Sequence, residues 1–181
     1  MKKILSACAV AAAFVAAPAF AQGYIGGGFG SSKLAGIDGG GTTGGNTNKS
    51  QVKVYGGFQF TPNWGVEAQF SDLGKRDILN NGAAAGSIKA SQFSIAGTGT
   101  LPLSSGFSLL GKLGVSANKV TGSGGLTNGS ATSALIGIGV SYNITPALSA
   151  RLEYEDFGIM AKFNPPTVRA NAYSISLKYA F

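Results

Sequence analysis

The sequence predicts an all-β protein, an eight-stranded antiparallel up-and-down transmembrane β-barrel. After residue 22, apolar and polar residues alternate with a period of two in repeated segments, which are separated by Gly, Ser, Asn and Pro. No apolar stretch in this part of the chain is long enough for a transmembrane helix. A protein that spans a membrane without helices must close its sheet, because only a closed barrel pairs every backbone N–H and C=O group.

The first residues have the three parts of a secretory signal peptide. Lys2 and Lys3 precede an apolar run, and the triplet Ala19-Phe20-Ala21 is a small-x-small cleavage site. A membrane anchor is the alternative, but the run is short, rich in Ala and interrupted by Pro18. We therefore predict a cleaved signal peptide over residues 1–21 and one outer-membrane β-barrel domain over residues 22–181.

Eight segments alternate over about the length that a tilted strand needs to cross the hydrocarbon layer. They are residues 23–31, 51–60, 64–71, 92–101, 107–117, 134–143, 148–155 and 171–181. Three connections are short (61–63, 102–106 and 144–147) and four are long (32–50, 72–91, 118–133 and 156–170). This pattern predicts short periplasmic turns, long extracellular loops and both termini in the periplasm.

The alternation separates an apolar face, with Leu113 and Ile138, from a polar face that contains several charged residues. A basic side chain in lipid costs up to about 2–4 kcal/mol, so four of them would cost as much as the ~5–15 kcal/mol that stabilises a whole domain. We therefore expect the apolar face to meet lipid and the polar face to fill a narrow lumen. The predicted lumen ion-pair residues are Lys53, Glu67, Lys112, Arg151, Glu153 and Lys178, with Glu155 as a further carboxylate.

A soluble barrel of lipocalin type, apolar inside and polar outside, is the alternative reading of the same alternation. Aromatic residues argue against it, because they gather at both ends of the predicted strands, as at the two interfaces of a bilayer. The turn-end group is Phe60, Trp64, Phe107, Tyr142, Tyr179 and Phe181, and the loop-end group is Phe29, Phe70, Phe93, Tyr154 and Tyr173.

The composition excludes several classes of function. The chain has no histidine, so it lacks the usual general base and the commonest metal ligand, and we predict a non-enzymatic protein without cofactor or metal. Its one cysteine, Cys8, lies in the predicted signal peptide, so we expect no disulfide. The basic residues are scattered singly, which gives no basic stripe for nucleic acid.

The C-terminal strand resembles the terminal signal of bacterial outer-membrane barrels. Its apolar residues stand at every second position and end in an aromatic residue: Tyr173, Ile175, Leu177, Tyr179 and Phe181. In those families the barrel-assembly machinery reads such a strand, and the resemblance implies this machinery as a partner. An ordinary edge strand that happens to end in Phe is the alternative.

Two further segments resemble the transmembrane barrel of the OmpA family. They are VYGGFQFTPNWGVEAQFSDLG (54–74) and VSYNITPALSARLEY (140–154). The resemblance implies that Glu67 and Arg151 pair across the lumen. Thr98 stands where the family has a lumen lysine and Ser141 where it has a lumen glutamate, so the other predicted lumen charges are expected to replace them. The chain ends at Phe181, and the periplasmic domain of full-length members is not expected.

These observations predict a protein of the Gram-negative outer membrane, held in lipid, with a structural or surface-interaction role. Its four long extracellular loops would meet a partner that the sequence does not identify. A narrow solute or ion pore is the second hypothesis, and we expect charge to plug it. A soluble periplasmic ligand carrier is the third.

Overall fold

The computed structural model of the chain describes residues 22–35, 42–44, 48–80, 83–123, 128–162 and 167–181. The predicted signal peptide lies outside these residues. The strands are β1 (Gln22–Ala35), β2 (Thr42–Gly44), β3 (Asn48–Gln59), β4 (Trp64–Asn80), β5 (Ala83–Pro102), β6 (Phe107–Ser123), β7 (Gly129–Asn143), β8 (Leu148–Lys162) and β9 (Thr167–Ala180). Within the described residues, no helix is long and apolar enough to span a membrane.

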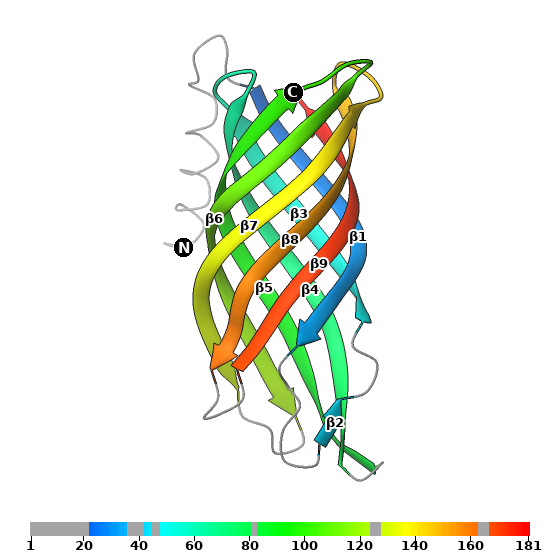
Figure 1. Ribbon diagram of the computed structural model, residues 1–181, viewed down its shortest axis with the longest axis vertical. Helices are drawn as coiled ribbons and strands as arrows, with labels where there is room; N and C mark the ends of the chain where they lie inside the picture. The colour runs from blue at the N-terminus through cyan, green and yellow to red at the C-terminus, as the bar shows by residue number, and fades with distance from the viewer. Residues whose placement is uncertain (1–21, 36–41, 45–47, 81–82, 124–127, 163–166) are drawn as a thin grey trace, which may run out of the picture.

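All these strands except the short β2 form one closed antiparallel barrel (Figure 1). The eight barrel strands pair in chain order, from β1 with β3 to β8 with β9. The first and last strands, β1 and β9, also pair with each other, which closes the circle. The last residue completes the seam, because the Phe181 backbone N–H donates a hydrogen bond to the Gly23 carbonyl at 2.9 Å. The predicted fold class, an eight-stranded up-and-down barrel, is confirmed.

The long connections are shorter than predicted, because the strands continue beyond the predicted segments. Most of the predicted loop 72–91 is a β-hairpin in which β4 runs to Asn80 and β5 begins at Ala83. The other three long connections also lose residues to their flanking strands. Past the lipid, a strand no longer needs an apolar outer face, so the alternation fades while the ladder of backbone hydrogen bonds continues.

Two of the three short turns are built in the same way around a Thr-Pro pair. The Thr61 side-chain oxygen accepts a hydrogen bond from the Trp64 backbone N–H at 2.9 Å, and Thr145 accepts one from Leu148 at 3.0 Å. A hydroxyl that bonds the backbone in this way stabilises a turn, and the proline that follows fixes φ. One turn joins β3 to β4 and the other joins β7 to β8. Both lie at the same end of the barrel, which we call the turn end.

At the opposite end, the loop end, β4 and β8 carry matching bulges with the sequence Asp-x-Gly. Asp72 accepts a hydrogen bond from the Gly74 N–H at 3.0 Å, and Asp156 accepts one from Gly158 at 2.8 Å. Both glycines have positive φ, 83° and 63°, which disfavours residues with a Cβ. The strand pairing shifts register at both bulges, in β4–β5 after Asp72 and in β8–β9 after Asp156. The two halves of the barrel therefore contain the same kind of bulge.

The outer surface carries the apolar face that the sequence predicts. Mid-strand residues such as Leu113 and Ile138 are more than half exposed, at 68% and 57%. The aromatic residues of both predicted groups stand on the same surface, and two cross-strand pairs touch, Phe107 with Tyr142 and Tyr154 with Tyr173. This exposed apolar surface with aromatic ends suits a bilayer and does not suit a soluble carrier.

Candidate functional site: a filled lumen with a basic cavity at its turn end

Lys112 on β6 is the centre of a charged layer inside the barrel. Its Nζ lies 2.6 Å from Glu67 Oε1, 2.6 Å from Glu153 Oε1 and 3.2 Å from Glu155 Oε1. Only 2% of the Lys112 side chain is exposed, and none of its three partners is more exposed than that. One ammonium group therefore bridges three carboxylates that come from two strands, β4 and β8.

Two more cations complete this layer. Arg151 Nη1 lies 2.8 Å from Glu67 Oε2, which also accepts a hydrogen bond from the Tyr24 hydroxyl at 3.0 Å. Lys53 Nζ lies 2.5 Å from Glu153 Oε2 and 3.2 Å from Glu155 Oε2. Buried charges are tolerated when they are paired and hydrogen-bonded, and here each carboxylate contacts two cations.

The structure thus brings together five of the six predicted lumen residues, and Glu155 joins them. The sixth, Lys178, is half-buried and lies apart from the carboxylates. Its Nζ is 5.3 Å from the centre of the Tyr24 ring, and within the described part of the chain it forms no ion pair. Lys178 therefore belongs to the mouth of the barrel at the turn end.

Two buried tyrosines in the lumen were missed by the sequence analysis. Tyr24 and Tyr55 stand edge to face with ring centres 6.4 Å apart. The ring of Tyr55 lies 5.5 Å from Lys53 Nζ, 5.5 Å from Lys112 Nζ and 5.1 Å from Arg151 Cζ. Both tyrosines are buried and face inward. Tyr55 stands two positions after Lys53 on the same strand, and side chains two positions apart point to the same face.

Small residues make room for these rings. A Cβ on Gly26 would clash with the Tyr55 ring, and one on Gly57 would clash with the Tyr24 ring. Both glycines stand on the inward face, where they leave space for large side chains from neighbouring strands.

A second layer, which is apolar, fills the lumen toward the loop end. Leu73 on β4 and Phe157 on β8 lie within the two Asp-x-Gly bulges, and neither is exposed to solvent. They form a cluster whose other members are Ile88, Ala90, Ala96, Val120, Leu135, Met160, Ala170 and Ala172. Leu73 and Phe157 lie in segments predicted to be loops, 72–91 and 156–170. Continuing the inward parity of β4 and β8 by one more residue pair would have found them.

Polar side chains hold this apolar layer to the bulges. The Ser32 hydroxyl donates to the Leu73 carbonyl at 2.6 Å, and the Ser116 hydroxyl donates to the Phe157 carbonyl at 3.1 Å. In both cases the serine precedes its acceptor by 41 positions. Asn118 also donates to the Phe157 carbonyl at 3.0 Å. Both bulges are thus tied to the next strand but one, β4 to β1 and β8 to β6, so the inward Leu73 and Phe157 are held in place.

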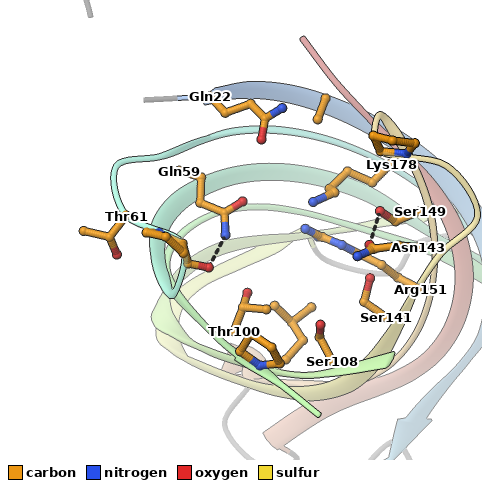
Figure 2. A pocket seen from close by; sticks show the side chains of 15 residues that line it. Gln22, Gln59, Thr61, Thr100, Ser108, Ser141, Asn143, Ser149, Arg151 and Lys178 are labelled. Carbon is orange, nitrogen blue, oxygen red and sulfur yellow. Dashed lines mark hydrogen bonds between the residues drawn. The ribbon is translucent and has the colours of Figure 1, made fainter. Parts of the chain in front are cut away.

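At the turn end the lumen opens into a cavity of about 400 Å³. Figure 2 shows Arg151 and Lys178 among the side chains that line it, together with polar residues such as Ser141, Asn143 and Ser149. Arg151 also belongs to the charged layer, so it forms the floor of this cavity. From the turn end inward, the barrel interior therefore presents a basic cavity, a charged layer and an apolar layer.

The C-terminal residues with the predicted assembly pattern all stand on the outer face of β9 or directly after it. Tyr173, Ile175, Leu177, Tyr179 and Phe181 are each at least half exposed. Between them, Ser174 and Ser176 are buried and face the lumen. β9 is the strand that closes the barrel against β1.

The described residues of the two layers hold no metal-binding group. Within the described residues, no group of three or more His, Cys, Asp or Glu side chains has an arrangement that holds a metal ion. The three carboxylates of the charged layer form ion pairs with Lys53, Lys112 and Arg151. Together, the closed barrel, its apolar outer face and its filled interior define a small transmembrane β-barrel.

The comparisons with known proteins place this barrel in a family. The chain belongs to the outer membrane protein beta-barrel domain family, whose model matches residues 5–181. No curated protein matches the chain. The predicted resemblance to small outer-membrane barrels is confirmed, and the family implies location in the bacterial outer membrane.

Solved outer-membrane proteins share the fold at low sequence identity. Neisserial surface protein A has a TM-score of 0.64 and 16% identity, with 88% of this chain and 97% of that chain covered. OprG from Pseudomonas aeruginosa has a TM-score of 0.61 and 15% identity, over 90% and 96% of the two chains. Ail of Yersinia pestis, solved in complex with the heparin analogue sucrose octasulfate, has a TM-score of 0.59 and 18% identity, over 90% and 99%.

Proposed function

We propose that this chain is a non-enzymatic outer-membrane protein that acts through the exposed surface of its loop end and does not transport solutes through its lumen. The observation that carries this proposal is the filled interior, where a charged layer and an apolar layer lie one behind the other. An eight-stranded barrel has room for side chains and little else, so solute-sized particles have no path. The loop end is the surface that the barrel presents to the outside of the cell.

The chemistry of the loop end favours an anionic partner. Lys75, Lys89 and Lys119 form what we call the β4–β6 basic patch, on the outer face of three adjacent strands. Lys75 on β4 stands directly opposite Lys89 on β5, and Lys119 on β6 stands opposite Ser91 on β5. Asp72 lies 2.9 Å from Lys89 at the edge of this patch. We infer that a polyanion, such as a sulfated glycan, docks on this patch, and the heparin-analogue complex of Ail makes that probe a natural choice.

Binding of heparin to the reconstituted barrel tests this role. Changing Lys75, Lys89 and Lys119 together to Gln is expected to weaken binding roughly 10- to 100-fold, since each surface cation contributes about 0.5–1 kcal/mol toward an anionic partner. Surface plasmon resonance on immobilised heparin measures the change. The matched control replaces the same three residues by Arg and is expected to keep the affinity. Equal affinity of the Gln variant and the wild type would reject the patch as the docking surface.

Export and assembly complete the proposal. The predicted signal peptide of residues 1–21 would direct the chain to the periplasm and be removed there. The outward apolar row of β9, which ends at Phe181, would then be read by the barrel-assembly machinery before the strand closes against β1. The exposed positions of Tyr173, Ile175 and Leu177 support this role, because an assembly partner needs to reach the face that later meets lipid.

A narrow pore is the second candidate function, and the cavity at the turn end is the observation that favours it. We expect wild-type protein in a planar bilayer to show little or only intermittent current, because each layer closes the path. Changing Glu67 to Gln loosens the charged layer, and changing Phe157 to Ala opens the apolar layer. Only the combined variant is expected to show frequent conductance steps.

The control for this measurement is Asp72→Asn, the same chemical change on the outer face of β4. It is expected to leave the current at the wild-type level. A large, steady current from wild-type protein would overturn the closed-lumen model and make transport the leading function.

A further inference from the structure

The cavity at the turn end of the lumen concentrates positive charge. It is lined by Arg151 and Lys178, and no Asp or Glu is among the described residues that line it. The other lining side chains are mostly hydroxyls and amides, and the rest are prolines, Leu110 and Ala180. Figure 2 shows both cationic side chains pointing into this space.

Both cations of the cavity lie near the ring of Tyr24. Arg151 Cζ is 5.2 Å and Lys178 Nζ is 5.3 Å from the centre of the Tyr24 ring. Like charges that share one cavity repel each other, and the low dielectric of a barrel interior strengthens the repulsion. The electron-rich ring face offsets a part of this cost for each cation.

The carboxylates of the charged layer do not neutralise this end of the barrel. Glu67 already contacts Arg151, Lys112 and the Tyr24 hydroxyl, while Glu153 and Glu155 contact Lys53 and Lys112. Within the described interior, four cations thus face three carboxylates, and Lys178 is the cation without an ion pair. The unbalanced positive charge therefore resides at the cavity.

Hydrogen-bond donors stand around the two cations. The Ser149 hydroxyl donates to the Asn143 side-chain oxygen at 2.9 Å, which orients the amide and leaves its N–H₂ group to bond elsewhere. Ser108 and Ser141 stand directly opposite each other on β6 and β7, and both line the cavity. Cations together with neutral donors are the groups that recognise carboxylate and phosphate oxygens.

We propose that the turn-end cavity is a binding site for a small oxyanion, a carboxylate or a phosphate, held between Arg151 and Lys178. A volume of about 400 Å³ is enough for a small molecule with such a group. The bound anion would supply the negative charge that this end of the lumen lacks. The site faces the compartment of the short turns and is separate from the loop-end surface proposed above.

Titration of ¹⁵N-labelled barrel in lipid nanodiscs tests this proposal. Sodium phosphate and sodium acetate are added in parallel at constant ionic strength, in a Bis-Tris chloride buffer, and amide shifts of Ser141, Asn143 and Ser149 are followed. We expect saturable shifts at these residues and none at Lys33, which is exposed on β1 near the loop end and lies outside the β4–β6 basic patch. Saturation by only one of the two probes would identify the ligand class, and saturation by both would define an unselective oxyanion site.

The variants Lys178→Met and Lys178→Arg separate specific binding from general charge effects. Lys178→Met is expected to weaken binding at least tenfold, and Lys178→Arg, which keeps the charge and the fold, is expected to retain it. Lys33→Met is the matched control near the loop end, outside the β4–β6 basic patch, and is expected to have no effect. Shifts that do not saturate with either probe, or that are the same in Lys178→Met as in the wild type, would overturn the proposal.

Discussion

Replacing Lys112 with Met is expected to destabilise the folded barrel by about 3–5 kcal/mol, because it leaves buried carboxylates without a shared cation. Lys112 is the only described residue that contacts Glu67, Glu153 and Glu155 together. Without it, Glu67 keeps Arg151, but Glu153 and Glu155 must share Lys53. Met has nearly the length of Lys, so the loss reports charge more than volume. Urea unfolding of the barrel in lipid vesicles, followed by the gel shift between folded and unfolded forms, measures this change.

Lys119→Met is the matched control, since it lies on the same strand with its side chain exposed. We expect a change within about 0.5 kcal/mol there, as for most surface substitutions. Adding Glu153→Gln to Lys112→Met should recover part of the lost stability, because one uncompensated carboxylate disappears. If Lys112→Met were as stable as the control, water or ions in the lumen would already screen these charges.

The sequence predicted the barrel well because the bilayer imposes a strict pattern on strands that cross it. Lipid outside and a narrow polar lumen inside force the period-two alternation, and the position of the turns follows from it. That is why the positions of Lys53, Glu67, Lys112 and Arg151 in the lumen were predictable. The ion-pair partner of each charged residue was harder to predict, because contacts across a barrel depend on the stagger of the strands and on how far each side chain reaches.

The apolar layer was missed for a related reason. Past the lipid boundary the outer face of a strand becomes polar, so the alternation that marks a strand fades while the inner face remains buried. Leu73 and Phe157 stand in this zone, next to Asp-x-Gly sequences that read as loops. The structure shows that these sequences are bulges within continuing strands. Tyr24 and Tyr55 were missed because aromatic residues were expected only on the outside.

Whether paired charge closes the lumen and whether the interior carries excess charge are two separate questions in this barrel. Charge was expected to plug the barrel by pairing, and the charged layer is paired. The excess cation, Lys178, stands outside that layer and at the mouth. A closed barrel and an anion site at its turn end are therefore compatible, since a ligand can enter the mouth without crossing the membrane.

Placing Arg at Ile138 is expected to destabilise the barrel by about 2–4 kcal/mol, because the side chain would stand in the middle of the hydrocarbon layer. Ile138 is 57% exposed on the outer face of β7, opposite Gly111 on one side and Tyr154 on the other. Arg at Thr132, on the same face of the same strand but near the loop end, is the matched control. There the cost should fall to about 0–1 kcal/mol, because the guanidinium reaches the interface.

The adjacent residue separates the effect of lipid from that of crowding. A Cβ on Gly137 would lie 3.3 Å from the Lys112 Cβ and 3.4 Å from the Glu155 Cγ, so even Ala must displace lumen side chains. We therefore expect Gly137→Ala to destabilise the barrel, whereas Ile138→Ala should cost little because lipid replaces the lost contacts. The same vesicle unfolding measures all four variants. If Arg were tolerated equally at Ile138 and Thr132, the outer face of β7 would not meet lipid at its middle, and the barrel would sit in the membrane differently from its apolar surface.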